Sequence, residues 1–269
     1  MSLSPDEFLQ AFHAAHPGAT SQAFADGRDD SGRSSYDLLA AATQPTDSVL
    51  DLGCGDGFLL ELIGDLQPSA SRTGVDMSLG ELQAARARSR LAGVPLACAK
   101  AQALPLADSA VDYVVSHLAF MLMSDIDVVC DEIARVLKPG GRFATVTGGG
   151  PGDGDSFELF LDLFRDVYAA SPTKAPRYGD KRTRYGDGIA ELFGSRFDAP
   201  VESRHTLRLD GPVERVWQCL STMYECFVLD EAALSGLHAR FVGEAGKLPT
   251  KDGLVPCTMR VRYVEIRKN

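Results

Sequence analysis

The stretch Val49-Leu50-Asp51-Leu52-Gly53-Cys54-Gly55-Asp56-Gly57 decides the fold of this chain. It begins with a short, mostly apolar run, which is typical of a strand buried on both faces in a parallel sheet. Three glycines at alternate positions follow, and glycine permits positive φ angles and a close approach of the backbone to a ligand. The next segment, Phe58 to Ile63, has the apolar spacing of a helix. Strand, glycine turn and helix together predict the first ligand-binding loop of a doubly wound α/β fold, with a plain tight turn as the alternative.

A second apolar run, Arg72 to Asp76, ends in a carboxylate about twenty residues beyond the glycines, where such folds bind a ribose hydroxyl. A dinucleotide-binding loop would have the pattern Gly-x-Gly-x-x-Gly. Here the third glycine, Gly57, comes one residue early, and Asp51 precedes the loop. No lysine or arginine lies in the loop. These features favour a cationic ligand without phosphates, and they leave an NAD-dependent oxidoreductase as a distant alternative.

Five short motifs follow one another at suitable spacings: Val49 to Gly57, Gly74 to Ser78, Leu104 to Leu106, Val111 to Ser116 and Leu137 to Gly141. In this order they resemble the class I S-adenosylmethionine-dependent methyltransferases of the small-molecule type, which include the ubiquinone/menaquinone C-methyltransferases. The resemblance covers about Val49 to Val146. It implies a doubly wound, Rossmann-like seven-stranded sheet, mostly parallel with an antiparallel last strand, plus a helical lid and insertion. It also implies S-adenosyl-L-methionine as cofactor and S-adenosyl-L-homocysteine as product.

The apolar patterning and the resemblance divide the chain into four parts. We expect a helical lid in residues 1–47, a cofactor-binding core in 48–150 and a helical insertion on the substrate side in 151–200. Residues 201–269 would supply closing strands and helices of the same domain. Within that last part, the pattern predicts one helix over Pro212 to Val228.

The resemblance implies a set of cofactor-binding residues, which are Asp51, Gly53, Cys54, Gly55, Gly57, Asp76, Met77, Ala101, Gln102 and Ser116. Asp51 and the glycine loop would face the methionine portion, and Asp76 the ribose hydroxyls. Met77 would pack on the adenine, with Ala101 and Gln102 at its edge, and the Ser116 carbonyl would lie near the sulfonium. A helix cap is the alternative for Asp76, although Ser78 already fills that position. Lys100 and Gln102 stand where the family usually has acids.

Candidate catalytic and substrate-binding residues carry a weaker signal. His117 follows the fourth expected strand at the ligand-binding edge, so it could act as a general base, or it could simply be a hydrogen-bonded packing residue. Tyr36 of the lid could face the substrate or belong to the core. A basic segment with tyrosines could clamp an anionic acceptor, with a solvated loop as the alternative; its candidate substrate-binding residues are Arg177, Tyr178, Arg182 and Tyr185.

Composition excludes several classes of partner. The net charge of −10 argues against nucleic acid and against an anionic membrane surface. No apolar run is long enough to span a membrane and no signal pattern appears. The six cysteines are scattered without metal-ligand spacing, so we expect reduced thiols, no metal site and a cytoplasmic protein. The acceptor is then expected to be a small molecule or a short peptide, and the protein a monomer or a homodimer.

The sequence therefore predicts a methyltransferase that acts on an oxygen, nitrogen or carbon atom of a small metabolite, and we expect this metabolite to be a biosynthetic intermediate. Two alternatives stay open. One is a non-catalytic S-adenosylmethionine-binding regulatory subunit, and the other is an enzyme of the same fold that uses the cofactor for another group transfer.

Overall fold

The computed structural model describes residues 3–269 and is built on a seven-stranded sheet with the order β3-β2-β1-β4-β5-β7-β6. The strands are β1 (Ser48–Leu52), β2 (Ser71–Asp76), β3 (Leu96–Cys98), β4 (Val111–His117), β5 (Leu137–Pro151), β6 (Val201–Arg208) and β7 (Thr258–Arg267). Neighbouring strands from β3 to β5 pair in parallel, whereas β7 runs antiparallel to both β5 and β6. The expected fold class, with its antiparallel last strand, is confirmed.

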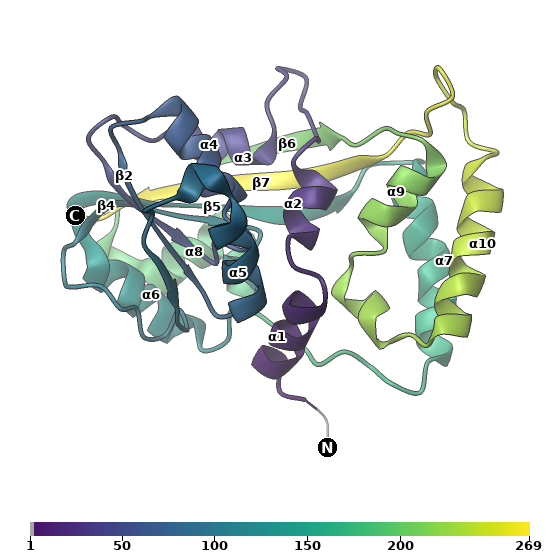
Figure 1. Cartoon of the computed structure of the whole chain (residues 1–269), viewed down its shortest axis with the longest axis horizontal. Helices are drawn as coiled ribbons and strands as arrows, with labels where there is room; N and C mark the ends of the chain where they lie inside the picture. Colours follow the sequence, from purple (N-terminus) through teal and green to yellow (C-terminus); the bar gives the residue numbers. More distant parts are fainter. Residues whose placement is uncertain (1–2) are drawn as a thin grey trace.

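Helices cover both faces of the sheet (Figure 1). They are α1 (Pro5–Ala15), α2 (Ala19–Phe24), α3 (Ser35–Ala40), α4 (Phe58–Leu66), α5 (Leu79–Ala87), α6 (Ile126–Val136), α7 (Ser156–Ala170), α8 (Gly186–Phe193), α9 (Val213–Leu220) and α10 (Glu231–Ala245). On one face Leu39 of α3 and Ile63 of α4 belong to the same core cluster as Val115 of β4. On the other face Ile133 of α6 and Phe193 of α8 pack in a second cluster. Both sides of the central strands are therefore buried, which explains their unbroken apolar runs.

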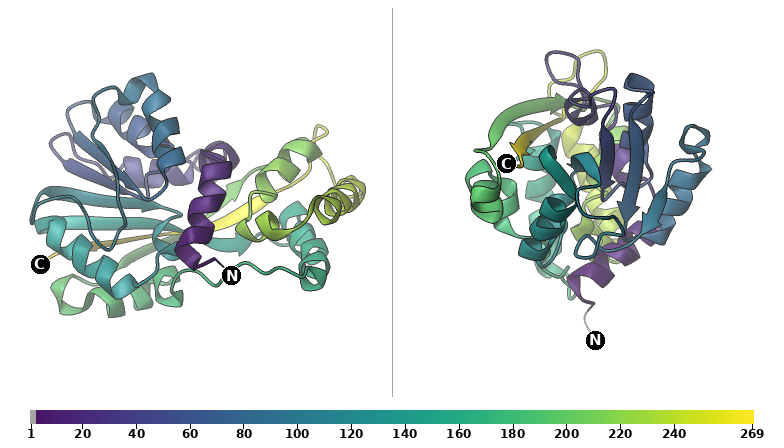
Figure 2. Two further views of the ribbon diagram at one scale, coloured as in Figure 1. Left: turned by 60° about the horizontal axis from the view of Figure 1, so that its bottom comes forward. Right: turned by 90° about the vertical axis from the view of Figure 1, so that its left-hand side faces the viewer.

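A separate helical group stands at the far end of the long strands β5 and β7 (Figure 1). It consists of α7, α9, α10 and the 3₁₀ turn η5 (Tyr224–Val228), and its own core includes Phe160, Trp217 and Phe241. Helices α1 and α2 lie between this group and the sheet (Figure 2). The expected insertion 151–200 is thus shared: α7 joins the helical group, while α8 covers the sheet.

Some local predictions differ from the structure. The helix expected over Pro212 to Val228 breaks after Leu220, because the Thr222 hydroxyl donates to the Cys219 carbonyl at 2.7 Å and competes with the helical bonding. The short helix α2 was not predicted. Residues 1–2 of the expected lid lie outside the described residues. Within residues 3–269, no helix has both the length and the apolar content needed to cross a bilayer.

Candidate cofactor and acceptor site

Three adjacent cavities lie at the carboxyl ends of β1, β2 and β4, beside the point where the strand order reverses. The first cavity is bordered by Met77, Ala101 and Gln102, and the second by the glycine loop. The first and second share Asp76, and the second and third share Tyr224. The three cavities therefore lie in a row, with Asp76 between the first and second and Tyr224 between the second and third.

Asp51 is a side chain of the second cavity whose polar atoms are buried without hydrogen-bond partners among the described residues. It is buried at the end of β1, and neither of its carboxylate oxygens has a hydrogen-bond partner among the described residues. Burial, with smaller contributions from the nearby acids Asp76 and Asp56, holds the pKa of the Asp51 carboxyl well above its usual range. A buried carboxylate without a partner is costly, so this position calls for a ligand that brings a cation or hydrogen-bond donors.

The glycine loop brings the backbone close to this carboxylate. Gly53 has φ +75°, and a Cβ there would lie 2.5 Å from the Cβ of Ala119, so only glycine fits. Cys54 and Gly55 also line the second cavity. Gly57 does not; it is the N-cap of α4, and a Cβ on it would collide with Leu91. Gly57 therefore serves the turn and the packing, and the structure does not place it against a ligand.

Asp76 closes the loop from the end of β2. Its Oδ2 accepts from the Gly55 amide at 2.9 Å and its Oδ1 from the Ser78 amide at 2.8 Å. Burial raises the pKa of its carboxyl, and the two amide hydrogen bonds act in the opposite direction. Ser78 is the N-cap of α5, as expected. Each oxygen of Asp76 keeps acceptor capacity, so the carboxylate can bind a pair of hydroxyls between the two cavities.

The first cavity holds the residues expected at an adenine. Met77, Ala101 and Gln102 line it, and the Gln102 amide nitrogen donates to the Ser124 carbonyl at 2.7 Å. This hydrogen bond leaves the Gln102 carbonyl oxygen as an acceptor for the cavity. Lys100 pairs at 2.5 Å with Asp6, an acid of α1 that also lines the cavity. The lid thus carries a carboxylate into the region where the core sequence lacks one.

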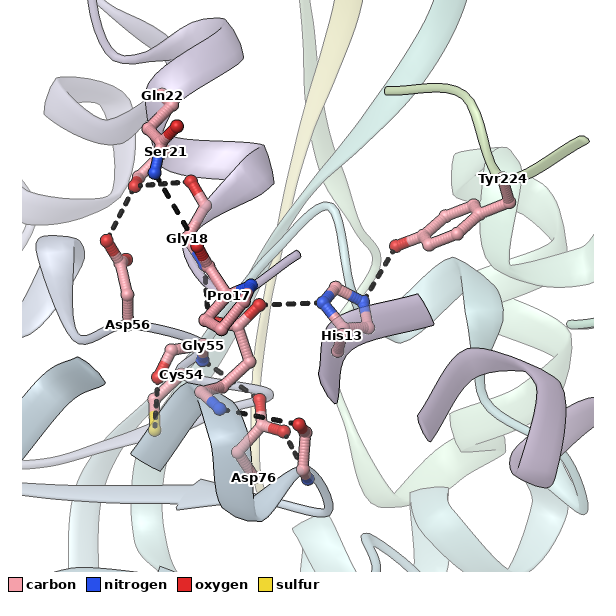
Figure 3. A network of polar contacts seen from close by, with 12 residues as sticks. His13, Pro17, Gly18, Ser21, Gln22, Cys54, Gly55, Asp56, Asp76 and Tyr224 are labelled. Atoms are coloured by element: carbon pink, nitrogen blue, oxygen red, sulfur yellow. Dashed lines mark hydrogen bonds and ion pairs between the residues drawn. The ribbon is translucent and has the colours of Figure 1, made fainter. Parts of the chain in front are cut away.

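A buried polar network, which we did not predict, ties the lid to the core. His13 of α1 contacts Glu81 of α5 through Nδ1 at 2.7 Å. Its Nε2 contacts the Tyr224 hydroxyl at 3.1 Å (Figure 3). Glu81 is buried and its other oxygen accepts from the Gly18 amide at 2.9 Å. With Glu81 accepting from Nδ1–H, the His13 Nε2 accepts from Tyr224. Glu81 therefore serves the lid and does not form the capping box that the spacing from Ser78 suggests.

A second contact of the lid involves the glycine loop. The Ser21 hydroxyl of α2 donates to Asp56 at 2.7 Å (Figure 3), and the same carboxylate pairs with Arg88. Together with the His13 network, this contact places α1 and α2 over the first and second cavities. Side chains from positions 13, 21, 81 and 224 meet here only through the fold, so no local sequence signal could have identified them.

His117 and Tyr36 lie together in the wall of the second cavity. Their rings are stacked with centroids 3.6 Å apart, and the His117 Nε2 contacts the Ser35 hydroxyl at 2.8 Å. Burial lowers the pKa of His117 from 6.5 to about 3. The ring is therefore neutral at physiological pH and already hydrogen-bonded, which fits a packing and orienting residue better than a general base with a pKa near neutrality.

Besides Gly57, four of the expected site residues line none of the three cavities. Ser116 is buried, its carbonyl accepts from the Thr145 hydroxyl at 2.9 Å, and it lines none of the three cavities. Arg182 pairs with Asp127 and Asp180, and Tyr185 is exposed beneath the Arg262 guanidinium. Neither of these two, nor Arg177, lines the third cavity. Within the basic segment, Tyr178 lines the third cavity, and so does Arg184, which was not among the expected site residues.

The third cavity has a volume of about 310 Å³ and mostly apolar walls from the lid, the ends of β5 and β7, and the helical group. Tyr178 donates to Glu225 at 2.6 Å on one side. Leu118, shared with the second cavity, has φ +52°, an uncommon conformation for a branched side chain. The cavity adjoins the second one at Leu118 and Tyr224, which is where an acceptor would meet a group carried by the cofactor.

These residues fit S-adenosylmethionine. An unpartnered carboxylate faces a position for an ammonium group, a second carboxylate faces a position for ribose hydroxyls, and an apolar cavity follows beyond. The strand order, the glycine loop and the two carboxylates together define a class I S-adenosylmethionine-dependent methyltransferase fold.

Comparison with known proteins agrees with this class. Residues 50–145 match the family described as "Methyltransferase domain". A malonyl-(acyl-carrier protein) O-methyltransferase of Methylococcus capsulatus is 39% identical over 106 residues, which are 39% of this chain and 38% of that protein. A fatty-acid O-methyltransferase of Mycolicibacterium smegmatis is 35% identical over 95 residues, 35% of each. The chain therefore aligns with well under two thirds of these relatives' length.

A solved structure shows the same fold. Phosphoethanolamine N-methyltransferase 2 of Haemonchus contortus, in complex with phosphomonomethylethanolamine and S-adenosylhomocysteine, superposes with a TM-score of 0.58 at 17% identity, over 99% of this chain and 60% of that one. The predicted resemblance to S-adenosylmethionine-dependent methyltransferases is confirmed.

Proposed function

We propose that this protein transfers a methyl group from S-adenosylmethionine to an oxygen atom of a small or carrier-bound acceptor held in the third cavity. The observation that carries the proposal is Asp51, a buried carboxylate with both oxygens unpartnered at the end of the glycine loop. The choice of oxygen is supported by the two relatives described above, whose names are both those of O-methyltransferases. All six cysteines are free, which suits the reducing cytoplasm as its place of action.

The described residues can bind the cofactor, exclude water and orient the acceptor, as this reaction requires. When bound, S-adenosylmethionine supplies an electrophilic methyl group. Asp51 would hold the ammonium group and Asp76 the ribose hydroxyls, while α1 and α2 cover the site and exclude water. The third cavity would hold the acceptor in line, and orientation of this kind corresponds to effective molarities of about 10⁵ to 10⁸ M. No residue needs to form a covalent bond with the substrate.

Two measurements on the purified protein test the proposal. Titration calorimetry with S-adenosylhomocysteine should show one binding site per chain. Incubation with S-adenosylmethionine labelled in its methyl group should transfer label to acceptors that carry a free oxygen nucleophile. Absence of binding would refute the cofactor assignment. Tight binding without label transfer would favour the regulatory-subunit alternative, and consumption of the cofactor without transfer of its methyl group would favour another group transfer.

A further inference from the structure

Arg184 is the cationic side chain of the third cavity. It comes from the 3₁₀ turn η3 (Lys181–Arg184), it is half-buried, and it makes no ion pair within the part of the chain that the structure describes. Its neighbour Arg182, by contrast, is neutralised by Asp127 and Asp180. An unpaired guanidinium facing an apolar cavity calls for an anionic ligand, because charged groups in apolar surroundings are normally paired.

A second observation locates the anion. The Arg184 Nη1 lies 4.0 Å from the Met121 sulfur, and the Gly148 backbone amide lies 3.4 Å from the same sulfur. Two donors, one of them charged, thus converge on a thioether, which is a weak acceptor. Methionine is flexible and can move aside. An oxygen anion at this position would satisfy both donors better than the sulfur does.

The acid in the same cavity does not fill this role. Glu225 is the acid that lines the third cavity, and it accepts from the Tyr178 hydroxyl at 2.6 Å. Among the described residues 3–269, Glu225 and Arg184 form no salt bridge. The Arg184 end of the cavity is therefore positive, and the remaining wall, with Phe12, Phe24 and Met259, is apolar.

We propose that the acceptor is a carboxylic acid with an apolar body, and that its carboxylate displaces the Met121 sulfur to bind the Arg184 guanidinium and the Gly148 amide. The proposal rests on the proposed methyl transfer and names its substrate class. One carboxylate oxygen is held by the two donors and the other attacks the methyl carbon. The new C–O bond forms as the C–S bond breaks with its electron pair staying on sulfur, so an anion and a sulfonium give an ester and a thioether, and no proton has to be removed.

This chemistry agrees with the state of the histidines at the site. His117 is neutral and bonded to Ser35, and both ring nitrogens of His13 are engaged by Glu81 and Tyr224. Neither is free to serve as a general base. A carboxylate, already ionised near neutral pH, is the oxygen nucleophile that needs none.

The test uses the full chain, labelled S-adenosylmethionine and saturated monocarboxylic acids of about 6 to 16 carbons, beside the matching primary alcohols and amides. Acids should be methylated in preference to their alcohols and amides. Arg184→Gln should lower kcat/KM for the acids by about tenfold to a hundredfold, the scale of a charged hydrogen bond, without changing the affinity for S-adenosylhomocysteine. Lys181→Gln removes the same charge from an exposed position of the same turn and should change neither.

The outcomes separate this inference from the proposed function. If S-adenosylhomocysteine does not bind, the proposed function fails first. If it binds while none of the acids is methylated, or while alcohols or amides are methylated as well as acids, the carboxylate assignment is overturned and the cofactor assignment stands. Equal loss of activity in Arg184→Gln and Lys181→Gln would also overturn it.

Discussion

Replacing Asp51 by asparagine tests the central physical claim about the site. In the free protein the Asp51 carboxylate is buried without a partner, whereas with S-adenosylmethionine bound it faces an ammonium group. A hydrogen bond to a charged group contributes about 1.5–3 kcal/mol, so Asp51→Asn should weaken cofactor binding by roughly 10- to 150-fold. The same change removes a buried charge, so the free variant should be more stable towards urea than the wild type at pH 7.

The sign of the pH dependence follows from the raised pKa of Asp51. The folded protein keeps this proton to a higher pH than the unfolded chain, whose carboxyl titrates near 3.8. The contribution of Asp51 to the unfolding free energy of the wild type therefore falls as the pH rises from about 4 through the raised pKa, and this contribution should be absent from the difference curve of Asp51→Asn. Urea denaturation from pH 4 to 8 and calorimetry with S-adenosylhomocysteine measure both effects. Asp162→Asn, at an exposed position of α7, is the control. Unchanged affinity, or a variant less stable than the wild type at pH 7, would refute the reasoning.

Three further predictions concern stability and the lid. Because burial lowers the pKa of His117 to about 3, the contribution of His117 to the unfolding free energy should fall by up to about 1.4 kcal/mol per pH unit below 6.5. The difference between wild type and His117→Asn should show this slope, and parallel curves would contradict it. Gly53→Ala should lower the unfolding free energy, measured by urea denaturation, by about 1–3 kcal/mol, because Gly53 has φ +75° and an added Cβ would collide with Ala119. Gly236→Ala, at an open position in a helix, should raise the unfolding free energy by up to about 1 kcal/mol in the same assay. His13→Ala should lower the unfolding free energy by about 1–3 kcal/mol and Tyr224→Phe by about 0.5–1.5 kcal/mol, whereas the double variant should lose little more than His13→Ala alone. Additive losses of unfolding free energy would show that the two side chains are not coupled.

The cofactor half of the molecule was predictable because its signals are local. A strand, a turn that only glycine can adopt and a following helix stand next to one another in the chain, and Asp76 ends the next strand. Parallel strands then bring Asp51 and Asp76 to one edge of the sheet without further information. Met77, Ala101 and Gln102 follow from the same topology, since each comes just after a strand of that sheet or in the loop beyond it.

The acceptor half was less predictable because it depends on contacts between distant segments. Ser116 was expected at the site because it lies near the end of a strand, but the sequence does not show that its carbonyl accepts a hydrogen bond from Thr145 of β5. In the basic segment, spacing could not tell which cation would be neutralised by Asp127 of α6 and which would face the cavity. The His13 network could not be predicted for the same reason. The spacing from Ser78 suggests that Glu81 caps its own helix, but in the fold Glu81 bonds to the lid instead.

The three cavities draw their walls from different parts of the chain, and this has an evolutionary consequence. The first cavity is lined entirely by residues before position 125, whereas most of the third is lined by residues from Gly148 onward. Substitutions in the later segments, except at Tyr224, which also lines the second cavity, can therefore alter which molecule is accepted without disturbing the binding of the methyl donor. Exchanging residues 152–257 between this protein and a homologue, with Tyr224 retained, would transfer the acceptor preference and keep the donor site.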